Sequence, residues 1–394
     1  MLLLDTILQS RVSRRPSLGA RLAETKGRPS GFDYLRISLA LAVIAMHGAI
    51  TTGGQEADFV LWETPLRSVL RAILPMFFAL SGFLVAGSLE RCRTLVSFLG
   101  LRVIRIYPAL TVEVILSAFI IGLSITTVPA RTYLTSPEFH RYLLNITGDI
   151  HYLLPGVFTN NPFPRTVNAQ LWTVPYELGC YVTISGLALI GVVKRPYLAP
   201  VAAVGICVLH LGYRLIKHHG QSLYMLGGIP GTLLIVSFLV GISLYLYRER
   251  VSWDGRLFGV AAVASALLAF VPGGEYLAVL LLGYVTVWLG LTDYRRLAVI
   301  RGADLSYGVY LYGFVIQQLF AFLFPQFRYW WASILVSVPC ALLFAAGSWN
   351  FIEKPALKLR GQLMKLEAML FPASGRPFWQ KKVPVENAAA AREV

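Results

Sequence analysis

Two ionisable side chains lie in the first long apolar run of the sequence, GFDYLRISLALAVIAMHGAI (31–50). Arg36 stands near the start of this run, and His47 follows eleven residues later. Eleven residues make three helical turns plus about 20°, so a helix places both side chains on one face, about 16 Å apart. A buried imidazole stays neutral, and a neutral imidazole accepts protons near pH 7. We predict that His47 is a general base; the alternative is a packing histidine satisfied by a neighbouring helix.

An arginine pair occurs in SFLGLRVIRIYPAL (97–110). Arg102 and Arg105 are three residues apart, so on a helical turn they point the same way. Pro108 suits the first turn of a helix, which puts the pair just before that helix begins. Two converging guanidiniums form a fork for phosphate that lysine does not reproduce. The alternative is that these arginines only set the membrane topology.

A carboxylate enters an apolar run in VNAQLWTVPYELGCYVTI (167–184). Trp172 is typical of the aromatic belt at a membrane interface. Glu177 lies five residues deeper, where a carboxylate needs a partner. If Glu177 meets His47, it orients the ring and stabilises the imidazolium formed during proton transfer. Glu113 is the rival carboxylate, and an arginine is its simplest partner.

The apolar runs that must position these groups recur along the whole chain of 394 residues. The composition is 56% hydrophobic and 14% charged, and the apolar blocks are long enough to cross a hydrocarbon core of about 30 Å. The sequence therefore predicts an all-α, polytopic transmembrane helix bundle. We expect ten spans, near residues 35–52, 69–89, 109–128, 173–193, 197–215, 229–247, 257–271, 275–291, 306–324 and 330–352.

The net charge of +15 follows the membrane pattern. With ten spans and both termini cytoplasmic, 27 of the 35 Lys and Arg residues fall in inside segments. These basic residues orient helices and contact anionic lipid, so we expect membrane lipid as a partner and no nucleic acid. The four cysteines are isolated in sequence, which predicts neither disulfides nor a metal site. His218 and His219 are adjacent and do not share a helix face, so we expect no metal there either.

Three regions are expected along the chain. Residues 1–30 form a basic, flexible cytoplasmic tail without a signal peptide, and residues 31–355 form the transmembrane domain. Residues 356–394 form a cytoplasmic amphipathic helix on the inner leaflet, followed by a disordered tail. The largest stretch outside the membrane is 129–172, which is a lid, an acceptor-binding surface or an ordinary connecting loop. The apolar face of the amphipathic helix consists of Leu359, Leu363, Leu366 and Leu370.

Six short motifs in a fixed order give the chain a family resemblance. They are FDYLR followed by His47, FFALSGFL (77–84), RVIRIYPAL (102–110), LWTVPYE (171–177), LSYGVYLYGF (305–314) and FIEKP (351–355). Over residues 31–360 the chain resembles the acyltransferase-3 family, bacterial membrane proteins that acylate sugars of surface polysaccharides and glycolipids.

The resemblance implies an activity and roles for the residues above. An acyl group, usually acetyl, passes from acyl-CoA to a sugar hydroxyl of a polysaccharide or lipid-linked acceptor, in the bacterial inner membrane and without a bound cofactor. His47 is expected to be catalytic with Glu177, and the guanidiniums of Arg36, Arg102 and Arg105 to bind the donor. The residues expected to support the site are Ser81, Trp172 and Tyr310.

One departure from the family pattern stands in the ninth span. Members often carry a histidine after its aromatic run, where this chain has Gly313 in YLYGF. The role of that second histidine is therefore not carried over. The main alternative function is a transporter or flippase for a glycolipid or small metabolite, and a scaffold or signalling protein is a third. No inverted repeat of the kind common in transporters is visible.

Overall fold

The computed structural model describes residues 15–217, 227–297 and 302–370. Within these residues the regular secondary structure is helical, which confirms the predicted all-α class. Extended pairing is confined there to two isolated bridges, Ser17 with Ser252 and Leu153 with Thr166. The expectations for His218, His219 and the tail from residue 371 lie outside the described residues.

The segment between α6 and α9 contains only short helices, whereas longer helices make up most of the other described residues. The elements of the first half are α2 (Leu18–Glu24), α3 (Gly31–Glu63), α4 (Arg67–Arg91), α5 (Leu95–Ile115), the π-helix η1 (Leu116–Ile121), α6 (Gly122–Ile125), α7 (Ala130–Thr135), α8 (Pro137–Leu143), η2 (Leu144–Thr147), η3 (Ala169–Thr173) and α9 (Val174–Leu189). Those of the second half are α10 (Leu198–Lys217), α11 (Gly231–Leu246), α12 (Gly255–Leu268), α13 (Glu275–Gly290), α14 (Ser306–Leu323), η5 (Pro325–Phe327), α15 (Trp330–Ser348), η6 (Trp349–Glu353), α16 (Lys354–Leu357) and α17 (Leu359–Leu370).

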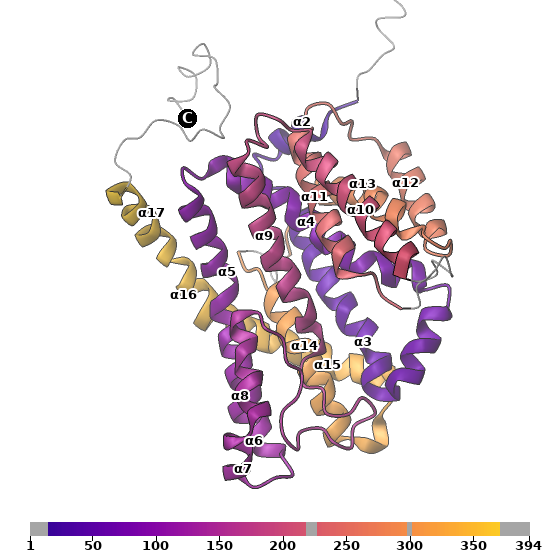
Figure 1. The fold of residues 1–394 in the computed structure, drawn as a ribbon, viewed down its shortest axis with the longest axis vertical. Coiled ribbons are helices and arrows are strands. Elements are labelled where there is room, and N and C mark those ends of the chain that lie inside the picture. The colour runs from indigo at the N-terminus through magenta and orange to yellow at the C-terminus, as the bar shows by residue number, and fades with distance from the viewer. Residues whose placement is uncertain (1–14, 218–226, 298–301, 371–394) are drawn as a thin grey trace, which may run out of the picture.

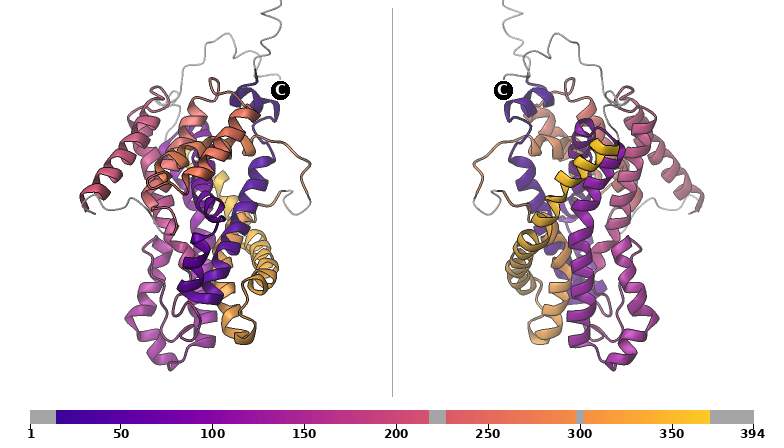
Figure 2. Two further views of the ribbon diagram at one scale, coloured as in Figure 1. Left: turned by 90° about the vertical axis from the view of Figure 1, so that its right-hand side faces the viewer. Right: turned by 90° about the vertical axis from the view of Figure 1, so that its left-hand side faces the viewer.

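The molecule has two ends that differ in what they carry. Helices α2, α12 and α13 gather at one end, which we call the α2 end, while α6, α7 and α8 form the other, the loop end (Figures 1 and 2). Helices α3, α5 and α9 run between them (Figure 1). These long helices carry His47, Arg36, Arg102, Arg105 and Glu177. Other site residues lie on α4, η3, α14 and η6 or directly before α14.

In the part of the chain that the structure describes, six helical segments are long and apolar enough to cross a membrane, and three shorter apolar helices, α11, α12 and α13, accompany them. The count of ten crossings and the cytoplasmic placement of both termini stay predictions. The six long helical segments are Gly31–Glu63, Arg67–Arg91, Leu95–Ile125, Leu198–Lys217, Ser306–Leu323 and Trp330–Leu370. The backbone at Gly54 is non-helical (φ 74°), so the regular part of α3 ends close to the predicted residue 52.

The third helix begins earlier than predicted. Thr94 caps it, because its side-chain oxygen accepts a hydrogen bond from the backbone N–H of Ser97 at 3.1 Å, and the helix then runs from Leu95. Pro108 is inside this helix rather than in its first turn. The prediction that the arginine pair precedes the helix is therefore wrong: both arginines lie in its body.

The described part of the N-terminal tail is folded, although residues 1–30 were expected to be flexible. Helix α2 begins after Ser17, and Leu18 is fully buried. The backbone N–H of Trp253 donates to the carbonyl of Pro16 at 2.8 Å, and Ser30 hydrogen-bonds with the backbone of Tyr294. An apolar anchor and these hydrogen bonds order a segment whose composition is polar.

Helix α17 packs along α5 (Figure 2). The side chain of Leu363 lies against Gly100, and Glu367 is buried. The other leucines of its predicted apolar face remain exposed, as a leaflet-facing surface requires, and contact with lipid stays a prediction. These exposed leucines are Leu359, Leu366 and Leu370.

Small residues of the segment PMFFALSGFLVAG (75–87) bring α4 into close contact with α11. A Cβ atom at Gly82 would lie 2.0 Å from the carbonyl oxygen of Phe238, and one at Gly241 would lie 2.0 Å from that of Ala79. Neither distance is sterically possible, so both positions require glycine. This contact fixes the position of α4 beside the helices that carry the site.

Candidate active site

His47 lies on the regular part of α3, and its side chain is half-buried. The ring meets Phe314 of α14 edge-on, with centroids 5.1 Å apart and planes at 85°. Among the described residues, no hydrogen bond or ion pair reaches an imidazole nitrogen. The packing alternative requires a polar partner from a neighbouring helix, and the described part of the chain supplies none. Both nitrogens are therefore available for chemistry.

Side chains hold the turn of α3 that carries His47. The Gln317 amide donates to the carbonyl of Ile44 at 2.9 Å, and Thr51 Oγ1 donates to the carbonyl of His47 at 2.9 Å. Thr52 Oγ1 donates to the carbonyl of Gly48 at 2.7 Å. The backbone beneath the imidazole is thus fixed by groups that leave its nitrogens uncovered, which preorganises the ring.

Two of the predicted arginines, Arg36 on α3 and Arg105 on α5, form ion pairs with carboxylates. The carboxylates belong to Asp304, directly before α14, and to Glu353 in η6. Arg36 Nη1 lies 3.0 Å from Asp304 Oδ2, and Arg105 Nη2 lies 2.5 Å from the same oxygen. The other terminal nitrogen of Arg105, Nη1, lies 2.9 Å from Glu353 Oε2. Arg36 and Arg105 therefore converge, as a phosphate fork would, but they converge on a carboxylate.

Asp304 is held in place from the other side by the start of α14. Its Oδ1 accepts hydrogen bonds from Ser306 Oγ at 2.6 Å and from the Ser306 backbone N–H at 3.3 Å. Burial alone would raise the pKa of Asp304, but the guanidiniums of Arg105 and Arg36 and the Ser306 hydrogen bonds lower it well below its ordinary value. Asp304 is therefore ionised at every physiological pH.

Arg102 shares the turn of Arg105 but not its ion pairs. Its Nη2 donates to Ser88 Oγ at 3.0 Å, and its guanidinium lies 5.7 Å from the Phe98 ring centroid and 6.0 Å from that of Tyr181. No carboxylate in the described residues forms an ion pair with it. Arg102 therefore has more of its charge available to an external anion than Arg105 has.

Glu177 lies with the arginines rather than with His47. Its Oε1 accepts a hydrogen bond from Tyr181 Oη at 2.6 Å, and its charged neighbours are Arg105 and Arg102. The described contacts of His47 do not include this carboxylate. The predicted role of Glu177 in orienting the imidazole depended on a meeting that the structure does not make.

Three further predicted residues have separate surroundings. Tyr310 Oη donates to the carbonyl of Gln170 at 2.6 Å and is hydrogen-bonded to Thr173 Oγ1 at 2.5 Å, which ties α14 to η3. Trp172 is half-buried and packs edge-on against Tyr176 at 5.7 Å. Ser81 is half-buried on α4, and no side-chain hydrogen bond joins it to another described residue.

The rival carboxylate, Glu113, is partnered at one oxygen by neutral groups and not by an arginine, while its buried Oε2 has no hydrogen-bond partner among the described residues. It is fully buried, and its Oε1 accepts hydrogen bonds from Ser117 Oγ at 2.6 Å and from the Asn168 amide. Asn168 also donates to Tyr142 Oη at 2.9 Å. This network joins α5 to α8 and to the segment that precedes η3, so Glu113 contributes to the packing of the loop end.

Comparisons with known proteins identify the family and two relatives of this chain. A family model described as an acyltransferase domain matches residues 30–352. The chain belongs to this acyltransferase family. It is 24% identical over 349 residues to an O-acetyl transferase of Shigella phage Sf6, covering 85% of this chain and 98% of the relative. It is 26% identical over 387 residues to nodulation protein 10 of Rhizobium leguminosarum bv. viciae, covering 88% and 98%. No solved structure was found to match it.

A side chain at position 313 of the acyltransferase, where the family resemblance places a second histidine, would require Ile44 to shift. A Cβ atom at Gly313 would lie 2.6 Å from Cγ1 of Ile44, because α14 and α3 pack closely there. The next residue, Phe314, supplies the ring against His47. Glycine at position 313, which departs from the family pattern, therefore allows α14 and α3 to pack closely beside the imidazole of His47.

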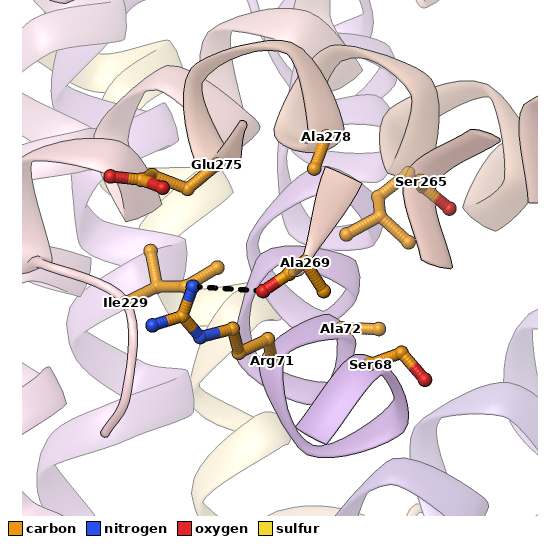
Figure 3. A pocket seen from close by; sticks show the side chains of 9 residues that line it. Ser68, Arg71, Ala72, Ile229, Ser265, Ala269, Glu275 and Ala278 are labelled. Atoms are coloured by element: carbon orange, nitrogen blue, oxygen red, sulfur yellow. Dashed lines mark hydrogen bonds between the residues drawn. The ribbon is translucent and has the colours of Figure 1, made fainter. Parts of the chain in front are cut away.

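A small cavity of the acyltransferase lies away from His47, between the start of α4, the end of α12 and the start of α13 (Figure 3). Its volume is about 10 Å³, which holds a single water molecule. Arg71 lies beside it and donates to the carbonyls of Ala269 at 3.5 Å and Gly227 at 3.2 Å. The cavity is too small for a sugar or an acyl chain, so we assign it no substrate.

Asp304 and Glu353 of the acyltransferase are absent from the residues predicted for this site. Charge balance is the signal that could have found them, because arginines at apolar helices need acids or ligands. Glu353 lies in FIEKP and Asp304 directly precedes LSYGVYLYGF, so both stand at recognisable positions. The pairing itself joins residues up to 268 positions apart and is visible only in the fold.

Proposed function

We propose that this acyltransferase is a membrane O-acetyltransferase that moves an acetyl group from acetyl-CoA to a sugar hydroxyl of a surface polysaccharide or glycolipid. The observation that carries the proposal is the imidazole of His47, which is fixed on an apolar helix without a polar partner among the described residues. Family membership and the name of the phage relative support acyl transfer to oxygen.

The chemistry assigned to His47 is general-base catalysis. The acceptor hydroxyl oxygen attacks the thioester carbonyl carbon while the imidazole takes the hydroxyl proton. The carbon–sulfur bond then breaks, the coenzyme thiolate leaves, and the imidazolium returns the proton to it. A variant of the mechanism passes the acyl group through the imidazole nitrogen, so that the two substrates need not meet. Both routes need an imidazole nitrogen free of structural hydrogen bonds.

The donor is assigned to the side of His47 on which the arginines lie. Arg36 precedes His47 by eleven residues on α3, which is about 16 Å along the helix. Phosphates of the coenzyme would contact Arg102 first and compete for Arg36 and Arg105, while the pantetheine arm carries the thioester towards His47. Glu177 has charged neighbours there, so its proposed contribution is to balance the arginines rather than to orient the imidazole.

The acceptor is assigned to the loop end, and the chain to the bacterial inner membrane with its arginines towards the cytoplasm. The segment between α6 and α9 is fixed to α14, because the Gln318 amide donates to the carbonyls of Phe163 at 2.8 Å and Thr166 at 2.6 Å. Phe163 in turn packs against Phe314, whose ring meets His47. The segment therefore supports a fixed acceptor-facing wall better than a mobile lid.

The deciding experiment compares surface glycans from a deletion strain with glycans from the complemented strain. Mass spectrometry should show the loss of one acyl mass on deletion, and acetate released by saponification should fall with it. A deletion that leaves glycan acylation unchanged, together with membranes that transfer no label from radioactive acetyl-CoA, contradicts the proposal.

The transporter alternative gives a different result in the same assay. A flippase would change the amount of glycan on the surface and leave the acyl content of each remaining glycan unchanged. Acyl content per sugar, rather than total acetate, therefore separates the two functions. A scaffold protein would show neither change after substitution of His47.

A further inference from the structure

The arrangement of Arg36, Arg105 and Asp304 resembles an anion site whose anion belongs to the chain itself. One carboxylate oxygen, Asp304 Oδ2, receives both guanidiniums, at 3.0 and 2.5 Å. Planar guanidiniums that converge on one oxygen also suit a phosphate oxygen. The side chains of all three residues are about a quarter exposed, so an external anion can reach them.

Asp304 and Glu353 differ in how far their side chains are exposed to solvent. The Glu353 side chain is 2% exposed, and its Oε1 accepts a hydrogen bond from Ser348 Oγ at 3.1 Å. Asp304 lies two residues before the start of α14 and keeps contact with solvent. Removal of Asp304 from Arg105 would still leave Glu353 on its other nitrogen, so the fork would keep its position.

From this asymmetry we propose that Asp304 is a positioning residue that occupies the place of a donor phosphate between Arg36 and Arg105. Binding of the coenzyme displaces this carboxylate, while Glu353 holds Arg105 in place. The ligand class is a phosphate monoester or diphosphate, here that of acyl-CoA, and the inference rests on the proposed function. Displacement weakens binding of every donor, and it penalises most an anion that cannot reach both guanidiniums.

The test measures the affinity of the purified full-length chain in lipid nanodiscs for coenzyme A and for pantetheine, which lacks the phosphates. Asp304→Asn should tighten coenzyme A binding by about 10-fold, because the ion pairs of Asp304 with Arg36 and Arg105 no longer have to be broken when the phosphate binds. Pantetheine affinity should stay unchanged. If Asp304 only held the fold together, its removal would instead weaken the binding of both coenzyme A and pantetheine.

Three further variants serve as controls. Asp304→Glu, which keeps the charge, should bind coenzyme A like the wild type. Glu353→Gln removes one negative charge beside Arg105 but leaves Asp304 in the proposed phosphate position. If Glu353→Gln tightened coenzyme A binding as much as Asp304→Asn, net charge alone would explain the effect, and the proposal would be overturned. Ser306→Ala loosens Asp304 without removing it and should tighten coenzyme A binding by a few-fold. It decides the question if Asp304→Asn does not fold.

The outcomes separate this inference from the proposed function. A wild-type chain that binds no coenzyme A contradicts the donor assignment itself. A wild-type chain that binds coenzyme A, with Asp304→Asn and Ser306→Ala binding no more tightly, contradicts the role of Asp304 alone.

Discussion

Two histidines on apolar helices of this protein have opposite surroundings. His47 on α3 and His210 on α10 are both half-buried. His210 Nδ1 shares a hydrogen bond of 2.7 Å with Tyr276 Oη, beside the ion pair between Arg214 and Glu275 at 3.1 Å. The imidazole of His47 meets the edge of Phe314 and no polar group in the described residues.

The difference shows that the polar partners of a histidine in a membrane helix help to separate a structural role from a functional one. A polar group in apolar surroundings is stable when a neighbour satisfies it, and His210 has such a neighbour in Tyr276. The His47 imidazole has no such neighbour among the described residues, which supports its proposed role towards a substrate. Sequence composition around the two residues does not distinguish them, but their partners do.

The largest expected effect contrasts the two histidines directly. His47→Gln should lower acyl transfer by about 10²–10⁴-fold, the usual contribution of a positioned base, while His210→Gln should keep activity within a few-fold of the wild type. Transfer of radioactive acetyl groups in membranes with matched protein levels measures both. Equal activities of the two variants would remove the functional meaning of the comparison.

The arginine pair extends the same contrast between satisfied and available groups. Arg105→Gln leaves the buried Glu353 uncompensated and should cost about 3 kcal/mol of folding stability, since breaking a buried pair is strongly destabilising. Arg102→Gln should cost less than about 1 kcal/mol but raise the KM for the donor. Thermal unfolding in detergent and donor titration separate the two effects. A larger stability loss for Arg102→Gln would reverse the assignment.

A histidine placed at position 313 tests whether the surroundings of His47 have room for a second one. Gly313→His should destabilise the fold by about 1–3 kcal/mol through overpacking against Ile44. The double substitution Gly313→His with Ile44→Ala should recover part of that loss, since it removes the obstructing side chain. The measurement is the change in Tm of Gly313→His, of Ile44→Ala and of the double variant, and additive losses would show that Ile44 is not the obstacle.

Acid should have the smallest effect, through Asp304. Because its ion pairs lower the pKa of the folded state, its contribution to stability is complete above the pKa of an unfolded aspartate, about 3.9, and is lost as the pH falls below it. Stability from this source should therefore be constant from pH 5 to 8. Unfolding curves at lower pH should show a smaller acid loss for Asp304→Asn than for the wild type; parallel curves would contradict the ion pairs.

Much of the frame was predictable because the periodicity and length of apolar runs are local properties. Each of the ten predicted apolar runs contains a helix, and the bounds of α4, α10, α11 and α13 differ from the predictions by a few residues. Pro108 predicts a first helical turn near residue 108, but α5 begins at Leu95, 13 residues before that proline, because Thr94 caps it. A proline is tolerated inside a long apolar helix that is held by its neighbours.

The site was predictable by residue type and only partly by contact. His47, Arg36 and Arg105 stood out because ionisable groups in apolar helices are rare and costly. Their partners did not, since nothing local links Arg36 to Asp304 across 268 positions. For the same reason the sequence offers Glu177 as a partner of His47 only conditionally, and the charged neighbours that the fold gives Glu177 are Arg105 and Arg102.

The sequence by itself determined the helical class, the acyltransferase signature and the side chains able to do chemistry, because those follow from composition and short motifs. Only the tertiary structure decided which of those side chains are already satisfied. Hydrogen bonds and ion pairs depend on distances of a few ångströms between helices, and the order of residues along one chain does not encode those distances locally.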